Sequence, residues 1–401
     1  MKNKYILYLL LLSTISFINS ILEIPLKPIQ VKGIPKYGLN LPSQEENTEE
    51  LEEEFDPKLL MEEGNAYINT NFLYIATARI GSDKQEFNFL LDTGSSDTWV
   101  PKKDCIAAFP KNHYYNPETS STSRNTNIPF QIRYGGGRSS SGIYYIDNFY
   151  YINNKDFPLQ FGVAIKTDFD INGADGIIGL ASYYSNENLS FISMLKNGGV
   201  TDSQMFSIKF GYNAIPGITG TFIVGKHPDF LNYNTVTTPL VQNPNVITHH
   251  WTCTINSFGI KYSNLLFQSN QSYNVIVDTG TNMIMLPLEY YNAIVNNVNN
   301  FNCHFIMNSQ NLYQLSCNNE NLLPEFRFEI NGNILIVPKY YAFVKMNNGI
   351  FYSKVVFFES NIYVIGTPFL FAFHTLFDKE NNVLQFYPER PEFLEKNGNL
   401  R

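Results

Sequence analysis

The sequence has little charge, and most of its acidity is confined to one segment. Charged residues make up only 16% of the 401 residues and hydrophobic residues 44%, a composition that supports a folded core and excludes a wholly disordered chain. Residues 45–63 hold ten acidic side chains and one lysine, a charge of −9, so subtracting them from the net charge of −8 leaves +1 for the rest. A nearly neutral body lacks the basic surface that nucleic-acid binding requires, so we expect no nucleic-acid partner.

Long hydrophobic runs are absent except at the N-terminus. There, Lys2 and Lys4 precede a mostly apolar stretch from Tyr5 to Ile18, which is too short to cross a hydrocarbon core of ~30 Å. We interpret residues 1–20 as a cleaved signal peptide, with a retained membrane anchor as the alternative. No later run reaches 18 apolar residues, so we expect no membrane span after signal removal. After removal of the signal peptide, we expect the protein to be secreted or held in an acidic vesicular compartment of the secretory pathway.

Cysteine is scarce as well. The sequence contains neither a C-x-x-C pair nor a cluster of His and Cys of the kind that forms a zinc site. We therefore expect neither a metal nor a cofactor. Of the four cysteines, Cys303 and Cys317 flank a 13-residue stretch, and in a secreted chain they predict a hairpin-type disulfide worth ~3 kcal/mol. Cys105 and Cys253 are far apart in the sequence, and free buried thiols are one interpretation of them.

Strand-forming runs are plentiful. From Tyr67 onward, short β-type stretches such as Phe72–Arg79 and Glu86–Leu91 are separated by Gly, Asn and Ser. Helical patterns are few: one covers Phe191–Lys196 before a Gly-Gly stop signal, and another covers Leu288–Val298. We therefore predict a mainly β protein with small helices.

An internal repeat is the most informative feature of the sequence. The decapeptide Asp92–Pro101 begins Asp-Thr-Gly, and so does Asp278–Pro287, 186 residues later. A second motif, Ile177–Gly179, recurs as Val364–Gly366 at a separation of 187. Because two different motifs repeat at nearly one offset, we predict two related β lobes.

Each Asp-Thr-Gly follows an apolar run, so a strand delivers each Asp to a turn. If the lobes are related by a twofold axis, the two turns meet at it. Two carboxylates a few ångströms apart cannot both ionise easily and therefore share a proton. The ionised one can act as a general base on a water molecule, while the protonated one can polarise a carbonyl. We therefore predict Asp92 and Asp278 as catalytic residues; for a single Asp-Thr-Gly, a turn Asp is the alternative.

The neighbours of the two acids are expected to support them. A glycine permits turn geometry that a Cβ would hinder. The threonine after each Asp can hydrogen-bond across the turns, and the hydroxyl three residues after each Asp can donate to its outer oxygen. The supporting residues are thus predicted to be Thr93, Gly94, Ser95, Thr279, Gly280 and Thr281.

These motifs resemble those of the pepsin-like aspartic proteases, over Tyr67 to Tyr387. The resemblance implies a bilobal β fold with an active-site cleft between an N-terminal lobe, 66–236, and a C-terminal lobe, 237–401. It also implies a monomeric endopeptidase that activates water with the Asp pair and hydrolyses internal bonds of a peptide or protein substrate, with a preference for hydrophobic residues. The Asn-rich composition is similar to that of the plasmepsins of apicomplexan parasites.

The segment Gln131–Gly137 resembles the flap of that family, a hairpin over the cleft. By this resemblance Tyr134 is the flap tyrosine, whose hydroxyl reaches the indole N–H of Trp99, and glycines from Gly135 onward let the hairpin bend. Gly136 stands where members of the family often have a hydroxyl, which removes one expected substrate hydrogen bond. A phosphate loop and a plain surface hairpin are the alternatives, but no Lys-Ser or Lys-Thr follows the glycines.

Aliphatic neighbours of the motifs are candidates for substrate binding. The resemblance places Leu90 and Ile177 in the pocket before the scissile bond. It places Ile276, His250 and Val364 in the pocket after it. Core packing is the alternative for each aliphatic residue, and a structural role is the alternative for His250.

Residues 21–65 show no strong periodicity, and we interpret them as a propeptide and an acidic junction, with an ordinary acidic linker as the alternative. Glu23–Lys27 resembles the start of the family's prosegments, which run as a strand against the mature sheet. Lys36 resembles the residue that occupies the active site in pepsin-type zymogens, where its ammonium would neutralise the carboxylates. We therefore expect a secreted zymogen.

Two other functions compete with proteolysis. The first is a catalytically impaired, pepsin-like protein that binds peptides without cutting them, but both Asp-Thr-Gly motifs are intact. The second is a glycosidase with two carboxylates, which would not predict a duplicated turn motif.

Overall fold

The computed structural model describes residues 22–30, 72–107, 113–134, 137–150, 156–168, 173–182, 190–210, 220–225, 227–231, 234–241, 250–298, 303–308, 311–346 and 348–396. Over these ranges the protein consists mainly of strands, which confirms the predicted mainly β, bilobal fold. None of the helices described is long and apolar enough to cross a membrane. The predicted signal peptide, the acidic junction, Lys36, Gly135 and Gly136 lie outside the described residues.

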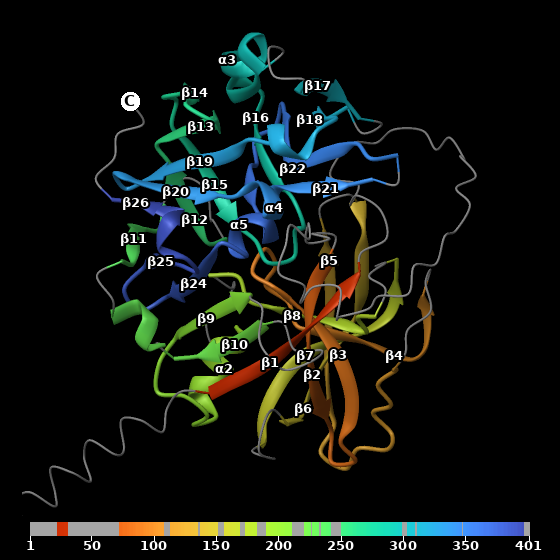
Figure 1. Cartoon of the computed structure of the whole chain (residues 1–401). Helices are drawn as coiled ribbons and strands as arrows, with labels where there is room; N and C mark the ends of the chain where they lie inside the picture. Colours follow the sequence, from red (N-terminus) through yellow and green to blue (C-terminus); the bar gives the residue numbers. More distant parts are fainter. Residues whose placement is uncertain are drawn as a thin grey trace, which may run out of the picture.

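The N-terminal half forms one end of a 13-stranded sheet, drawn in orange to yellow-green in Figure 1. Its strands follow one another in the order β2, β3, β8, β4, β7, β6 and β5. They are bounded as β2 (Phe72–Ile80), β3 (Gln85–Asp92), β4 (Trp99–Ala107), β5 (Arg124–Arg133), β6 (Ser139–Tyr150), β7 (Asp156–Thr167) and β8 (Gly176–Gly179). Helix α2 (Phe191–Asn197) begins after Ser190, whose side chain accepts from the Ser193 N–H, and ends at Gly198 as predicted.

The C-terminal half contains two further sheets, of eight and five strands, in the green to blue part of Figure 1. The larger has the order β12-β15-β23-β16-β22-β18-β17, with β21 paired to β22, and the smaller has the order β14-β13-β19-β20-β26. Their strands are β12 (Thr252–Ile255), β13 (Ser257–Tyr262), β14 (Leu265–Ser269), β15 (Tyr273–Val277), β16 (Ile284–Pro287), β17 (Cys303–Met307), β18 (Tyr313–Cys317), β19 (Glu325–Ile330), β20 (Asn333–Val337), β21 (Phe343–Lys345), β22 (Phe351–Phe358), β23 (Val364–Ile365) and β26 (Leu394–Glu395). The helical elements are α3 (Leu288–Val298), η8 (Glu320–Leu322), α4 (Lys339–Ala342), α5 (Thr367–Leu370) and η9 (Pro391–Phe393).

A disulfide joins two neighbouring strands of the C-terminal half. Cys303 on β17 is bonded to Cys317 on β18, as the spacing predicts, and the two residues face each other in the antiparallel register. The other two cysteines, Cys105 and Cys253, carry thiols in the structure. Burial raises the pKa of Cys253 to about 12, so this thiol is not a nucleophile near neutral pH.

The sequence repeat corresponds to a repeated arrangement of strands. In the N-terminal half, β3 pairs parallel with β8, β8 pairs antiparallel with β4, and β4 pairs parallel with β7. In the C-terminal half, β15, β23, β16 and β22 repeat those three pairings in the same order and with the same directions. Each Asp thus follows a strand that pairs with neighbours on both sides within its sheet, and the residues before it are mostly buried.

One sheet connects the two halves. It contains β1 (Leu22–Gln30), β9 (Met205–Phe210), β10 (Gly220–Val224), β11 (Val236–Pro239), β24 (Phe373–Asp378) and β25 (Val383–Pro388). Strand β24 comes from the C-terminal part of the chain yet pairs with β9, and Phe377 of β24 stacks on Phe206 of β9 with ring centroids 4.8 Å apart. Trp251 packs edge-on against both rings, so a buried aromatic cluster lies where the halves join.

Strand β1 lies inside this connecting sheet. Its first half pairs antiparallel with β10, from Leu22 opposite Val224 onward, and its second half pairs antiparallel with β2. Leu26, in the middle of the strand, is fully buried. Figure 1 shows β1 in red, crossing the middle of the molecule.

Candidate active site

Two buried threonines connect the turns that carry the acids. The Thr93 N–H donates to Thr279 Oγ1 (3.1 Å), and the Thr279 N–H donates to Thr93 Oγ1 (3.0 Å). Each hydroxyl in turn donates across to a backbone carbonyl of the opposite half, Thr93 to Val277 (2.8 Å) and Thr279 to Leu91 (2.7 Å). Four hydrogen bonds therefore fix one turn against the other, in a place that water does not reach.

Each carboxylate is held in the same way by its own turn. The Gly94 N–H donates to Asp92 Oδ1 (2.9 Å), and the Ser95 hydroxyl donates to Asp92 Oδ2 (2.5 Å). Asp278 receives matching bonds at 2.8 and 2.5 Å, from the glycine N–H two residues later and the threonine hydroxyl three residues later. Both carboxylates consequently have fixed orientations, with Oδ2 on the hydroxyl side and Oδ1 on the glycine side.

The two acids lie against each other's glycines. A Cβ placed on Gly94 would lie 2.7 Å from Cγ of Asp278, and one placed on Gly280 would lie 2.6 Å from Oδ1 of Asp92. No side chain fits at either position without displacing a carboxylate. The absence of a Cβ on these two residues thus lets the carboxyl groups, one from each half, meet.

Burial and mutual repulsion together change the protonation of the pair. Asp92 is only 6% exposed, and its burial, followed by the charge of Asp278, raises the pKa of Asp92 well above its ordinary range. The hydrogen bond from Ser95 opposes this shift but does not cancel it. The site therefore retains one proton at a pH where isolated carboxyls are ionised, and the pair can donate and accept a proton together.

Comparison with known proteins agrees with this geometry. The family model described as eukaryotic aspartyl protease matches residues 73–388, most of the chain. The chain belongs to the eukaryotic aspartyl protease family. It is an aspartic endopeptidase, as the resemblance of its motifs to the pepsin-like aspartic proteases implied.

Relatives within the family cover most of the chain. Pepsin A of Gallus gallus is 28% identical over 80% of this chain and 86% of its own length. Chymosin of Bos taurus is 28% identical over 79% of this chain and 81% of its own, and plasmepsin I of Plasmodium falciparum is 27% identical over 79% and 69%. The three relatives match the chain about equally well, so identity does not favour the plasmepsins over the pepsins.

Two of the residues predicted for the flap, Tyr134 and Trp99, lie in contact in this member of the family. Tyr134 directly follows β5, and its hydroxyl accepts a hydrogen bond from the indole N–H of Trp99 (2.5 Å). Between β5 and β6, the Gly137 N–H donates to the Tyr134 carbonyl (3.2 Å), and Gly137 has a φ of +78°. Burial raises the pKa of Tyr134, so its hydroxyl keeps its proton.

An acidic residue beside this pair was missed by reasoning from the sequence. Asp97 lies two residues before Trp99, and its carboxylate accepts hydrogen bonds from the Tyr144 hydroxyl and from the Ser96 hydroxyl (3.0 Å). Its charge also contributes to the raised pKa of Tyr134. The only indication in the sequence that Asp97 belongs to the site is its place inside the decapeptide Asp92–Pro101. Nothing in the sequence indicates its pairing with Tyr144 on β6.

The aliphatic residues assigned to substrate pockets form two equivalent cross-strand pairs. Leu90 faces Ile177 in the β3–β8 register, and Ile276 faces Val364 in the β15–β23 register. Leu90 and Ile177 are buried with Trp99 in a small cluster on which Tyr134 packs. Ile276 is only partly buried, in the corresponding cluster of the other half, which also contains Val364.

His250 occupies a separate position at the junction of the halves. It is partly exposed, and its carbonyl accepts from the Ser182 hydroxyl (3.0 Å). The next residue, Trp251, donates its indole N–H to the Leu180 carbonyl (2.7 Å). The backbone around His250 is thus tied to the segment that follows β8.

Proposed function

We propose that Asp92 and Asp278 hydrolyse peptide bonds by activating one water molecule between them. The observation that carries this proposal is that each carboxylate lies against the glycine of the other turn, with both turns fixed by the reciprocal threonine bonds. A rigid, buried pair with one shared proton has the acid and the base that water attack on an amide requires.

In this mechanism the raised pKa of Asp92 makes it the protonated partner. Asp278 accepts a proton from water as the water oxygen bonds to the carbonyl carbon, and Asp92 donates its proton to the carbonyl oxygen. The resulting tetrahedral diol collapses when Asp278 passes its proton to the amide nitrogen, the C–N bond breaks, and a diol hydroxyl returns a proton to Asp92. Both acids end as they began.

The surroundings of the pair support a preference for hydrophobic residues beside the scissile bond. The apolar pairs Leu90 with Ile177 and Ile276 with Val364 lie next to the two acids in the sequence and in the strand register. Tyr134 packs on the first of these clusters, and we assign it and the following Gly135 to a flap that closes over a bound peptide. We place His250 at the pocket after the scissile bond, where its imidazole would make selectivity depend on pH.

We further propose that the chain is made as a zymogen and acts as a monomer. Residues 1–20 serve as a signal peptide into the secretory pathway, and 21–65 as a propeptide followed by the acidic junction. Pairing of β1 with both β10 and β2 supports a prosegment that folds as part of the enzyme. The Cys303–Cys317 disulfide supports an oxidising compartment. A relative from Candida albicans is named secreted aspartic protease 3.

A single experiment separates a protease from a protein that only binds peptides. The purified proform is incubated between about pH 4 and pH 7, and cleavage of a peptide with hydrophobic residues at its centre is followed by mass spectrometry. We expect internal cleavage that falls by about 10²-fold or more in Asp278→Ala and in Asp92→Asn, with both variants still folded by circular dichroism. Peptide binding without cleavage by the wild-type protein, or cleavage retained by either variant, would overturn the proposal.

A further inference from the structure

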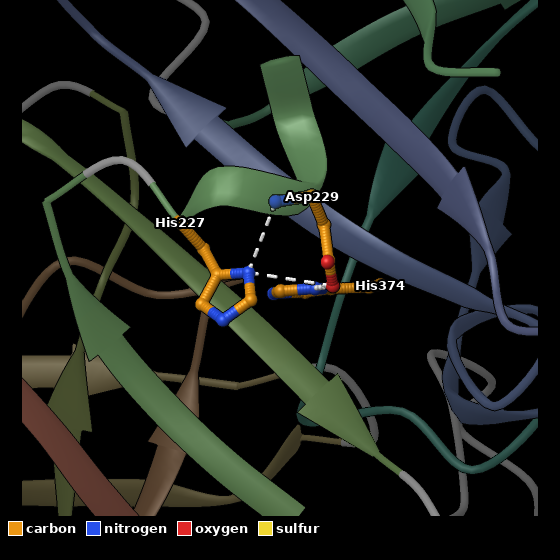
Figure 2. Close-up of side chains that lie close together, drawn as sticks. All are labelled: His227, Asp229 and His374. Carbon is orange, nitrogen blue, oxygen red and sulfur yellow. Dashed lines mark hydrogen bonds and ion pairs between the residues drawn. The ribbon is translucent and has the colours of Figure 1, made fainter. Parts of the chain in front are cut away.

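Three side chains of the kind that bind transition metals meet outside the Asp pair. Figure 2 shows His227 and Asp229, at the start of η6 (Pro228–Leu231), converging on His374 of β24. One ligand atom from each residue lies within 4.8 Å of the other two. Asp229 and His374 are 145 residues apart in the sequence, so no spacing motif indicates this cluster, and the sequence alone predicted no metal site.

Two of the three distances within the cluster match those between ligands of a tetrahedral ion. Asp229 Oδ2 lies 3.2 Å from His374 Nδ1 and 3.3 Å from His227 Nδ1. With metal–ligand bonds of about 2.0–2.1 Å, neighbouring ligands of a tetrahedral Zn²⁺ are separated by about 3.4 Å. Two of the three edges already have about that length. His227 Nδ1 also accepts a hydrogen bond from the Asp229 N–H (3.2 Å), so metal binding requires the partly exposed His227 side chain to give up this bond and turn toward the ion.

His374 has the surroundings of a metal ligand. Its imidazole is fully buried and packs against Phe230 with ring centroids 4.6 Å apart, so its orientation is fixed. Its other ring nitrogen, Nε2, lies 2.9 Å from the buried Ser207 hydroxyl. A histidine that binds a metal through one nitrogen commonly donates the N–H of the other to such a partner.

In the structure, the positive charge of Lys209 lies beside the Asp229 carboxylate. Lys209 Nζ lies 3.6 Å from Asp229 Oδ2 and 3.9 Å from Glu389 Oε2, closer to Asp229 but beyond hydrogen-bonding distance of both. Its side chain is 32% exposed, so the ammonium can move toward Glu389 when a cation approaches Asp229. Lys209 therefore competes with a metal for Asp229, and Glu389 offers it an alternative partner.

We propose that His227, Asp229 and His374 form a Zn²⁺ site that ties the segment after β10 to β24. Two imidazole nitrogens and one carboxylate oxygen suit Zn²⁺ and not Ca²⁺ or Mg²⁺, which prefer oxygen ligands. Water completes the fourth position. The site is independent of the Asp pair, and its role is to fasten a C-terminal strand to the N-terminal half across the connecting sheet.

The site is tested on the untagged proform after removal of metal with a chelator. Titration with zinc chloride by calorimetry should give one strong site per chain, and Co²⁺ in place of Zn²⁺ should give the intense visible bands of tetrahedral coordination. Zinc should also raise the midpoint of thermal unfolding, because a ligand that binds only the folded state stabilises it. We expect His227→Ala and Asp229→Asn each to weaken binding by about tenfold or more.

Matched variants separate this site from other sources of binding. His304→Ala removes an exposed histidine on β17 and should leave the affinity unchanged. Asp278→Asn should also leave it unchanged, since the Asp pair is not involved. Lys209→Met should tighten binding by roughly tenfold, because it removes a like charge next to the ion. No binding to the wild-type chain, or equal binding by the His227 and Asp229 variants, would overturn the proposal.

Discussion

Thr279→Val should strongly weaken the junction between the two turns. Valine nearly matches threonine in shape but lacks the hydroxyl that accepts from the Thr93 N–H and donates to the Leu91 carbonyl. The substitution therefore leaves one donor and one acceptor unpaired in a buried place. At about 1–3 kcal/mol for each unsatisfied group, the free energy of unfolding should fall by about 2–6 kcal/mol.

The measurement is urea unfolding of the purified proform, followed by tryptophan fluorescence, since Trp99 and Trp251 are both buried. Thr375→Val is the matched control, because Thr375 is equally buried but its hydroxyl donates only to the carbonyl of Phe373, two residues away. That control should cost about 0.5–1.5 kcal/mol. A loss in Thr279→Val no larger than in the control would refute the reasoning.

The same substitution should affect catalysis, because the turns position the carboxylates. We expect kcat to fall with little change in KM, since a misaligned pair still leaves the substrate pockets intact. An unchanged kcat in a destabilised variant would show that the carboxylates keep their geometry without the threonine bonds.

Three further outcomes follow from the site and the fold. Because Asp92 must be protonated and its pKa is raised, kcat/KM should decline as the pH rises through that pKa, with the decline at a higher pH than an ordinary carboxyl would give; a profile flat from acid to neutral pH would contradict this assignment. Gly94→Ala places a Cβ 2.7 Å from Cγ of Asp278 and should lower kcat by about 10²-fold or more while circular dichroism stays native, whereas near-normal kcat would show that the pair tolerates displacement. Reduction of the Cys303–Cys317 disulfide should lower the free energy of unfolding by ~3 kcal/mol in urea titrations, with Cys303→Ser/Cys317→Ser as the comparison, and an unaltered midpoint would refute the loop-entropy estimate.

The sequence alone predicted the two related lobes because the decisive signals are local. Each Asp follows an apolar run, and two motifs repeat at nearly the same offset, so both halves are recognisable without knowledge of their contacts. The helix over Leu288–Val298 was predicted with the bounds that the structure shows, since its pattern lies within a single element.

Features that depend on pairing between distant strands were not predictable in this way. The pairing of β24 with β9 brings His374 next to His227 and Asp229. The sequence around these residues contains no motif that indicates this contact. The bond between Tyr144 and Asp97 likewise arises from how β6 folds over the first turn. The continuity of β1 with strands on both sides also depends on segments far away in the chain.

The connecting sheet restricts how the protein can open. From β25 through β24 to β9 and β10, backbone hydrogen bonds run without a break from C-terminal strands to strands of the N-terminal half, and this path does not depend on β1. Swinging the halves apart as rigid bodies would require breaking one of these ladders, whereas the β5–β6 hairpin moves without cutting any of them. With the β5–β6 hairpin as the proposed flap, we therefore expect a polypeptide substrate to enter by bending of this hairpin while the connecting sheet stays intact.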